Sequence, residues 1–317
     1  MTAGPPEAPT GPSGIAFGVD IGGTKVLGVA LDGDDRVVAE ARVATPQAAG
    51  DPDGHPPGPI GAEVADAVDQ VVTALRQAVD PSPAGVLPGV PVAVGVGAPG
   101  MVDRDGVLRF APNLPGAAGA DVRGLVADRL PGVALVVDND ANLAAVAEHR
   151  LGAAAGTDHA VVVTLGTGIG GGLLVGGRVL VGRAGFAGEI GHMIVDPTGP
   201  PCPCGQRGCW ERYASGGGLA RLAREAAYAG QLHEVVGIAG GDPELVRGEH
   251  VTRAALDGDP GAVAVMEELG WWVALGLANL VAVVDPERIV LGGGLVEAGD
   301  ILLAPTRRAF AGLVEGG

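Results

Sequence analysis

Positive charge and aromatic side chains are both scarce in this sequence. Lysine and arginine together number 20 against 37 aspartate and glutamate residues, so the formal net charge is −17. Nucleic acids and anionic membranes bind proteins largely through lysine and arginine, so neither is expected as a partner. Aromatic residues make up 3% of a chain that is 47% hydrophobic. The core must therefore consist mainly of alanine, valine and leucine.

Long apolar runs and targeting signals are also missing. No apolar stretch is expected to be long enough to span a bilayer. Residues 1–14 are rich in proline and glycine and contain neither the basic nor the apolar region of a signal peptide. We therefore expect a disordered tail at residues 1–14 and a cytoplasmic protein. The remaining length has room for two domains, which we place at residues 15–140 and 141–317.

Several residue types occur only a few times, and the few copies are clustered. Lys25 is the only lysine, three of the four asparagines are Asn113, Asn139 and Asn142, and all three cysteines lie between residues 202 and 209. A bias toward arginine and alanine can come from genome composition. Such a bias does not explain why the exceptions fall inside short motifs, so these motifs hold the candidate functional residues.

Acidic and amide side chains follow an apolar run at residues 133–137 that is typical of a buried strand. Asp138, Asn139 and Asp140 come next, and residues 143–148 are typical of a helix. Ligands of open α/β sheets bind where strands end and helices begin. A partly desolvated carboxylate at that place can take a proton from a substrate hydroxyl. The alternative is an Asx-type helix cap without a catalytic role.

A glycine turn follows the first predicted strand, residues 15–20. The strand ends at Asp20, and the turn consists of Gly22, Gly23, Thr24 and Lys25. Glycines at such a turn let the backbone approach a phosphate, while the threonine offers a hydroxyl and the lysine a cation. Asp20 can hold a magnesium ion through water. The alternative is a plain hairpin turn between this strand and the next, at residues 26–31.

The same arrangement recurs about 145 residues further along the chain. Residues 160–165 are predicted to form a strand, and a glycine turn is predicted at residues 166–172, beginning with Gly166, Thr167 and Gly168. Two such units indicate a duplicated domain in which each half supplies one phosphate loop.

The rest of the pattern alternates strands and helices. Further strands are predicted at residues 36–45, 90–97 and 289–291, and helices at 60–79, 216–229 and 262–284. Asn113 lies on a loop, where its amide can bind a polar ligand or make an Asx turn. Gly292 and Gly293 follow the last strand and can approach a nucleotide base or ribose. Trp271 and Trp272 are expected in the core or in a subunit interface.

The three cysteines, Cys202, Cys204 and Cys209, lie within eight residues of one another. Three thiols cannot all pair as disulfides, but they can bind zinc if a fourth ligand exists. His192, ten residues before Cys202, is the nearest candidate. A set of three cysteines and one histidine leaves no open coordination position, so this zinc would be structural. The alternative is a group of buried, reduced thiols.

A zinc-bound His192 keeps its second ring nitrogen for a ligand. Glu189 and Glu211 flank the cluster in the sequence. Two carboxylates and an imidazole held together by a metal suit the recognition of a polyol. The alternative is that both glutamates are surface residues or partners of Arg207 and Arg212.

Taken together, these motifs resemble the ROK family of bacterial sugar kinases and repressors, and within it the glucokinases of the actinobacterial type. The resemblance extends from about residue 14 to the end of the chain, and the cysteine segment with Glu189 and His192 is its most specific part. It implies an α/β, actin-like (ribonuclease H-like) duplicated fold with two domains around a central cleft. It also implies ATP-dependent phosphorylation of glucose at its 6-hydroxyl, with magnesium and a structural zinc.

The resemblance also implies roles for single residues. Asp140 would be the general base that receives the proton of the 6-hydroxyl. The sugar contacts would be Asn113, Asn139, Asp140, Glu189, His192 and Glu211. The nucleotide and its magnesium would be held by Asp20, by the two phosphate loops and by Gly292 and Gly293. The zinc ligands would be His192, Cys202, Cys204 and Cys209.

Two departures from the family pattern bear on these expectations. Relatives usually carry a large aromatic residue shortly after the Asn113 turn, whereas Gly116, Ala117 and Ala118 stand here, which puts the exact hexose in doubt. Relatives also continue past the last residue of this chain with a strand and a helix, so the C-terminal domain is expected to lack its last pieces. Uncovered apolar surface there would lower stability by several kcal/mol at roughly 25 cal/mol per Å².

Two other functions compete with glucose phosphorylation. One is a kinase for another hexose or an N-acetylhexosamine, because the small residues after Pro115 can admit a bulkier sugar. The other is a sugar-sensing regulator, but only about 14 residues precede the first strand, too few for a DNA-binding domain.

Polyphosphate is a conceivable donor, ranked below ATP because the kinases that use it generally lack the cysteine loop. A homo-oligomer, a dimer or tetramer, is expected, with the helix at 262–284 as a candidate contact.

Overall fold

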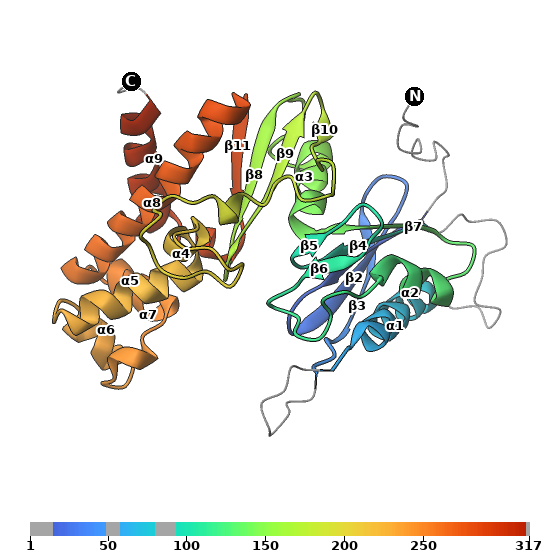
Figure 1. Cartoon of the computed structure of the whole chain (residues 1–317), viewed down its shortest axis with the longest axis horizontal. Coiled ribbons are helices and arrows are strands. Elements are labelled where there is room, and N and C mark those ends of the chain that lie inside the picture. The colour runs from blue at the N-terminus through green and yellow to red at the C-terminus, as the bar shows by residue number, and fades with distance from the viewer. Residues whose placement is uncertain (1–14, 49–57, 80–92, 315–317) are drawn as a thin grey trace. The chain divides into compact units, whose positions relative to one another are not determined.

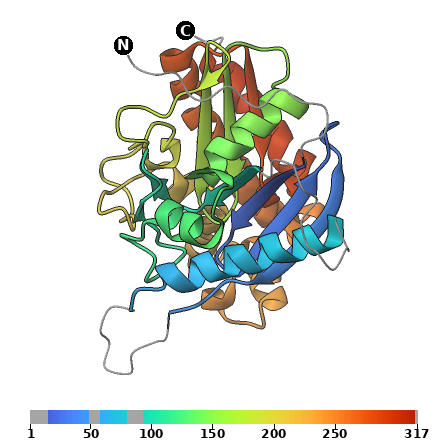
Figure 2. The same ribbon diagram turned by 90° about the vertical axis from the view of Figure 1, so that its right-hand side faces the viewer.

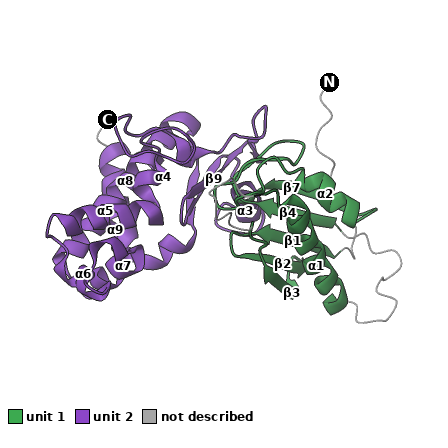
Figure 3. Ribbon diagram, turned by 60° about the horizontal axis from the view of Figure 1, so that its bottom comes forward, with its two compact units in different colours: residues 1–140 green, residues 141–317 purple. Residues whose placement is uncertain are grey.

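The computed structural model of the chain describes residues 15–48, 58–79 and 93–314. The predicted disordered tail at residues 1–14 lies outside the described residues. The chain divides into two compact units, Met1–Asp140 and Ala141–Gly317, which have different colours in Figure 3. Each unit is built on its own mixed β-sheet, and each is described by itself below.

The first unit is organised around a five-stranded sheet with the strand order β3-β2-β1-β4-β7. Strands β1, β2 and β3 are antiparallel, whereas β4 and β7 continue parallel to β1. The described residues of the unit also form a two-stranded ribbon of β5 and β6 and two helices. The elements are β1 (Ala16–Ile21), β2 (Lys25–Leu31), β3 (Val37–Ala44), α1 (Gly61–Val79), β4 (Ala93–Ala98), β5 (Met101–Val102), β6 (Leu108–Phe110), α2 (Val122–Arg129) and β7 (Ala134–Asn139).

Helix α1 covers one face of this sheet, as Figure 2 shows. Its apolar residues recur at helical spacing, and Val64, Val68, Val71 and Leu75 are each at most 1% exposed. Burying one such side chain contributes about 1.5–3 kcal/mol. The helix lies so close to β2 that a Cβ on Gly28 would stand 2.2 Å from Cγ1 of Val71. The predicted helix at residues 60–79 is confirmed.

The second unit contains a four-stranded sheet with the strand order β10-β9-β8-β11 (Figure 1). Strand β8 pairs antiparallel with β9 and parallel with β11, as β1 pairs antiparallel with β2 and parallel with β4. The predicted repetition of strand, glycine turn and strand is therefore present in both sheets. The elements are α3 (Asp140–Leu151), β8 (Ala160–Leu165), β9 (Ile169–Val175), β10 (Arg178–Val179), the 3₁₀ helix η1 (Ile190–His192), α4 (Glu211–Ala214), α5 (Gly216–Tyr228), α6 (His233–Ile238), η2 (Pro243–Leu245), α7 (Gly248–Leu256), α8 (Pro260–Val284), β11 (Arg288–Gly292), η3 (Gly294–Ala298) and α9 (Asp300–Val314).

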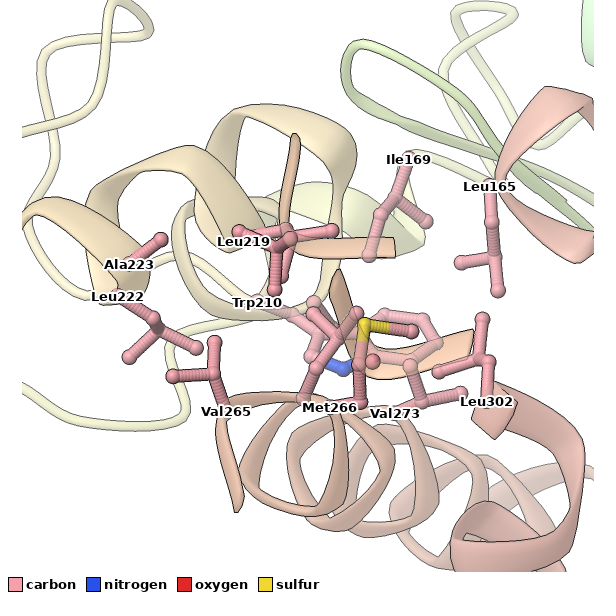
Figure 4. Close-up of a cluster of buried hydrophobic side chains, with 14 of the residues drawn as sticks. Leu165, Ile169, Trp210, Leu219, Leu222, Ala223, Val265, Met266, Val273 and Leu302 are labelled. Carbon is pink, nitrogen blue, oxygen red and sulfur yellow. The ribbon is translucent and has the colours of Figure 1, made fainter. Parts of the chain in front are cut away.

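The core of the second unit lies between its sheet and its helices. Val161 and Val163 of β8 belong to a large cluster with α5 and α8, while Val162 joins Ala145 of α3 on the other face. A strand with both faces covered is largely apolar, and in β8 only Thr164 is polar. Figure 4 shows the large cluster, in which Trp210 and Met266 lie together.

Helix α8 corrects one expectation from the sequence. By length and composition it can cross a membrane, because it has 25 residues and a mean hydropathy of 1.4 over an 18-residue window. The expectation that no apolar run is long enough was therefore wrong. Its residues Met266, Leu269 and Val273 are nevertheless at most 1% exposed and pack in the core cluster. Packing within the unit thus accounts for the apolar residues on the buried face of α8, whereas Val283 is 82% exposed.

The second glycine turn is shorter than predicted. It ends at Gly168, and the following residues belong to β9. A Cβ on Gly171 would stand 2.2 Å from Cδ1 of Ile190, and one on Gly172 would stand 2.3 Å from Cβ of Ala145. These two glycines therefore allow η1 and α3 to pack directly against β9, and they are not part of the turn.

Candidate active site

The carboxyl ends of three parallel strands bring the first group of candidate residues to one edge of the first sheet. Asp20 of β1 is in register with Gly97 of β4, which is in register with Asp138 of β7. Neighbouring strands lie about 4.8 Å apart, so Asp20 and the end of β7 are separated by roughly 10 Å. This is the edge at which open α/β sheets bind ligands.

Asn139 and Asp140 lie where β7 ends and α3 begins. The Asn139 side-chain amide donates to the Gly100 carbonyl at 2.8 Å, which ties this junction to the turn after β4. Asp140 is the first residue of α3. A carboxylate in the first helical turn is stabilised by the positive end of the helix dipole. The structure thus places Asp140 where a negative charge is favoured, at the edge described above.

The first glycine turn connects β1 to β2. Its closing hydrogen bond runs from the Gly22 amide to the Lys25 carbonyl at 2.9 Å. Within the described part of the chain, the N–H groups of Gly23 and Thr24 donate to no acceptor. Two consecutive open amides form a cradle suited to an anion such as a phosphate. Asn113 lies beside it, because a Cβ on Gly23 would stand 3.1 Å from the Asn113 carbonyl oxygen.

Asp20 stands at the start of this turn. Desolvation raises the pKa of its carboxyl group above the ordinary value, and the nearby Lys25 ammonium opposes that rise. A carboxylate whose charged form is disfavoured gains from a bound cation. That Asp20 holds a magnesium ion stays a prediction.

The second glycine turn has the same open amides. It is closed by a hydrogen bond from the Gly166 amide to the Gly168 carbonyl at 3.0 Å. The N–H groups of Thr167 and Gly168 find no acceptor among the residues that the structure describes. Each of the two predicted phosphate loops thus offers two consecutive amides.

A cavity of about 990 Å³ opens beside the second turn, entirely within the second unit. Its walls come from the start of α5, from α7 and from η3. Leu256, which lines it, is 66% exposed, so an apolar surface is open to a ligand there. The lining residues are Gly166, Thr167, Gly216, Gly217, Ala220, Arg247, Gly248, Glu249, Thr252, Arg253, Leu256, Asp257, Gly294, Leu295, Glu297 and Ala298.

Sequence reasoning identified only part of this cavity. The predicted nucleotide residues Gly292 and Gly293 do not line it, whereas Gly294 and Leu295 do. Gly293 instead packs against β8, because a Cβ there would stand 2.5 Å from the Leu165 carbonyl oxygen. The wall formed by α7 was missed, because its sequence shows only the amphipathic pattern of a surface helix.

The four predicted zinc ligands lie together in the second unit. Their ligand atoms are all within 4.8 Å of one another. The His192 Nδ1 atom is 3.7 Å from Cys202 Sγ, and Cys204 Sγ is 3.6 Å from Cys209 Sγ. A tetrahedral zinc with bonds of about 2.3 Å to sulfur holds two sulfurs about 3.8 Å apart. The residues therefore fit a zinc ion.

The electrostatics of the cysteine cluster also favour a bound metal ion. Burial raises the pKa of the Cys202 and Cys209 thiols above the ordinary value. Without a cation these thiols stay protonated, and the Cys202 thiol donates a hydrogen bond to Glu211 Oε1 at 3.1 Å. Binding as thiolates requires a positive charge among the sulfurs, which a divalent metal supplies.

His192 connects this cluster to both flanking carboxylates. Its Nδ1 atom faces the sulfurs and is 3.7 Å from Glu211 Oε1, while its Nε2 atom is 3.9 Å from Glu189 Oε2. Glu211 also reaches the second glycine turn, because a Cβ on Gly168 would stand 2.8 Å from its Oε2 atom. The structure thus brings Glu189, His192 and Glu211 together beside Gly168, as one group.

The loop that carries the cysteines is braced by residues that sequence reasoning did not single out. Asp196 accepts hydrogen bonds from the Tyr213 hydroxyl at 2.7 Å and from the Thr198 hydroxyl at 2.7 Å. These bonds lower the pKa of Asp196, while burial and the Asp196 carboxylate raise the pKa of Tyr213 to about 12. The Tyr213 ring stacks on Trp272 of α8 with centroids 4.0 Å apart. No local sequence pattern predicts these contacts, because Asp196, Tyr213 and Trp272 are far apart in the sequence and meet only in the folded unit.

Known proteins resemble this chain over nearly its whole length. Residues 16–316 match the model of the ROK family. Glucokinase from Streptomyces coelicolor is 36% identical over 96% of this chain and 89% of its own length. Glucokinase from Thermotoga maritima is 39% identical over 68% of this chain and 67% of its own length.

A solved structure agrees with these sequences. The ROK family glucokinase from Streptomyces griseus, in complex with glucose and AMPPNP, superposes with a TM-score of 0.75 at 38% identity, covering 96% of this chain and 91% of its own. The predicted α/β fold of the actin-like ATPase class is confirmed. This protein belongs to the ROK family.

Proposed function

We propose that this protein transfers the terminal phosphoryl group of ATP to the 6-hydroxyl of glucose. The observation that carries the proposal is the pair of glycine turns, each with two consecutive open amides: Gly23 and Thr24 in one unit, Thr167 and Gly168 in the other. Phosphoryl transfer depends mainly on positioning and on offsetting negative charge, and such turns supply both. Glucokinases 36–39% identical to this chain support the same reaction.

Asp140 would be the general base. Its side chain stands in the first turn of α3, and a carboxylate there can accept the proton of the attacking hydroxyl. Asn139 and Asn113 would hydrogen-bond the sugar. The tie from the Asn139 amide to Gly100 would fix the junction that carries the base.

Candidate nucleotide-binding groups occur within each unit. The cavity beside α7 would hold the nucleoside, with Leu256 and Leu295 offering apolar contacts to the base. The open amides of the two glycine turns would bind the phosphates. Asp20 would hold a magnesium ion, which offsets phosphate charge when it is bound. Lys25 would add a further positive charge in an otherwise acidic protein.

The zinc would be structural and would take no part in the chemistry. His192, Cys202, Cys204 and Cys209 would hold it, and a full set of four protein ligands leaves no place for substrate. With Nδ1 of His192 on the metal, its Nε2 would face the sugar together with Glu189 and Glu211. The metal would thereby fix the orientation of the ring that reads the sugar hydroxyls.

No structural observation favours the alternative of a bulkier sugar. That idea rested on small residues after Pro115. Gly116 has a backbone φ of +86°, and a Cβ there would stand 2.3 Å from the Gly58 carbonyl oxygen. Ala117 is 1% exposed and packs in the core. Gly116 and Ala117 are thus explained by the turn and by packing, whereas Ala118 is exposed. The cytoplasmic location and the homo-oligomer remain predictions.

The test is a coupled assay of the purified protein with magnesium and ATP. Glucose, mannose and N-acetylglucosamine are compared as acceptors, and ATP and polyphosphate as donors. We expect the highest kcat/KM for glucose with ATP. A higher kcat/KM for N-acetylglucosamine would indicate a hexosamine kinase instead of a glucokinase. If no sugar is phosphorylated, the proposal is contradicted. Operator binding in a gel-shift experiment would instead indicate a regulator.

A further inference from the structure

Two residues that follow β3, Thr45 and Gln47, donate hydrogen bonds to the first glycine turn, residues 22–25. The Thr45 hydroxyl donates to the Gly22 carbonyl at 2.6 Å, and the Thr45 amide donates to the Thr24 carbonyl at 3.1 Å. The Gln47 side-chain amide donates to the Gly23 carbonyl at 2.9 Å. Three consecutive carbonyls of the turn are therefore tied by donors from one short segment.

These ties determine where the amides of the turn point. In a trans peptide the carbonyl of one residue and the N–H of the next point in opposite directions. Because the carbonyls of Gly22 and Gly23 point toward Thr45 and Gln47, the N–H groups of Gly23 and Thr24 point away from them. These are the two amides without an acceptor among the described residues.

The second phosphate loop is held in the same way by different donors. The amide of Gly216 donates to the Gly166 carbonyl at 2.8 Å, and the amide of Gly217 donates to the Thr167 carbonyl at 3.3 Å. Here the first turn of α5 takes the place of the two side chains. The open amides are again those that follow the tied carbonyls, Thr167 and Gly168. The same backbone arrangement occurs twice, although its donors differ.

Burial and location support a specific role for this segment. Thr45 is 4% exposed, and its hydroxyl is bonded to the turn 23 residues away in the sequence. Lys25 of β2 pairs with Ala44 at the end of β3. This pairing places Thr45, the next residue after β3, beside the glycine turn that precedes β2. The Gln47 amide also contacts the Thr45 carbonyl at 3.3 Å, which couples the two residues.

We propose that Thr45 and Gln47 are positioning residues for donor phosphate binding. They act through the carbonyls of residues 22–24 and aim the amides of Gly23 and Thr24 at the phosphates. The inference rests on the proposed function, because it takes the phosphates to be those of ATP. It assigns a role in the reaction to two residues that touch neither the sugar nor the reacting atoms.

The experiment measures binding of two probes by calorimetry in the presence of magnesium. AMPPNP carries the full set of phosphates, whereas AMP carries the nucleoside and one phosphate. We expect Thr45→Val and Gln47→Met each to weaken AMPPNP binding about five- to tenfold, since each removes one hydrogen bond that holds the loop. AMP binding changes less than twofold, and Thr45→Ser restores AMPPNP binding because it keeps the hydroxyl.

Thr157→Val serves as the matched control. Its hydroxyl also donates to a backbone carbonyl, that of Ala154 at 2.8 Å, and it is 5% exposed. It lies in neither phosphate loop, so it should lose stability but no AMPPNP affinity. If Thr45→Val does not fold, the Gln47→Met variant carries the test, because Gln47 is exposed. Thermal unfolding checks that this variant is intact.

The outcomes separate this inference from the proposed function. The inference is overturned if both variants bind AMPPNP as the wild type does, if they lose AMP affinity equally, or if the wild type binds no AMPPNP. If the wild type binds AMPPNP but phosphorylates no sugar, the proposed function fails. In that case the variants still decide the role of Thr45 and Gln47 by their AMPPNP affinity alone.

Discussion

Trp210 connects the cysteine loop to helix α8, and its removal gives a quantitative test of this packing. The side chain is 0% exposed, and its Nε1 atom donates to the Trp272 carbonyl at 2.7 Å. Its ring lies directly on the α8 backbone, because a Cβ on Gly276 would stand 2.0 Å from it. Figure 4 shows Trp210 among the buried side chains of the cluster.

Trp210→Ala removes the ring and the indole N–H that donates to the Trp272 carbonyl. Truncating a buried tryptophan costs about 3–5 kcal/mol, and the lost hydrogen bond from the indole N–H adds about 1 kcal/mol. We therefore expect a loss of about 4–6 kcal/mol, which lowers the melting temperature by roughly 10–20 °C at about 2–4 °C per kcal/mol. Thermal unfolding followed by circular dichroism measures it.

Two matched variants sharpen this test. Trp210→Phe keeps most of the ring volume and loses the N–H donor, so it should cost about 1–2 kcal/mol. Trp271→Ala removes a neighbouring tryptophan that is 42% exposed, so it should cost far less than Trp210→Ala. A Trp210→Ala protein as stable as Trp271→Ala would refute the packing argument.

Three further predictions concern the same unit. Elemental analysis of the purified protein should find about one zinc per chain, and Cys209→Ser should lower that content and raise the KM for glucose; wild-type protein without zinc would contradict the site. Gly171→Ala should cost about 1–3 kcal/mol in urea unfolding because its Cβ overlaps Ile190, whereas no loss would contradict the contact. Hydrogen bonds led by the one from the Thr198 hydroxyl lower the pKa of Asp196 below 3.8, so its stabilisation is present above that pH and is lost as the pH falls through the lowered pKa. Asp196→Asn should therefore destabilise the protein at pH 7 and weaken the loss of stability in acid; equal acid sensitivity in urea unfolding would contradict this.

The sequence predicted best where a pattern is local and periodic. The apolar spacing of α1 repeats over five helical turns, so both its type and its extent were predicted. The cysteines lie within eight residues, so their convergence needed little of the fold. His192 is ten residues upstream of Cys202, and it was predicted as the fourth ligand because it is the nearest candidate in the sequence.

Features formed by tertiary contact were missed or misassigned. Nothing local distinguishes Thr45 from other threonines at strand ends, and its role depends on the pairing of β2 with β3. The glycines at 170–172 were assigned to the turn because glycine usually indicates one. In the structure Gly171 and Gly172 serve the close packing of Ile190 and Ala145, which a single sequence does not reveal.

The central claim is that Asp140 accepts the proton of a bound glucose. The most direct test compares wild type with Asp140→Asn, which keeps the size of the side chain and removes its basicity. We predict that kcat falls by about 10²-fold or more, while the Kd for glucose measured by calorimetry changes only a few-fold. An Asp140→Asn enzyme with near-normal kcat would contradict the account.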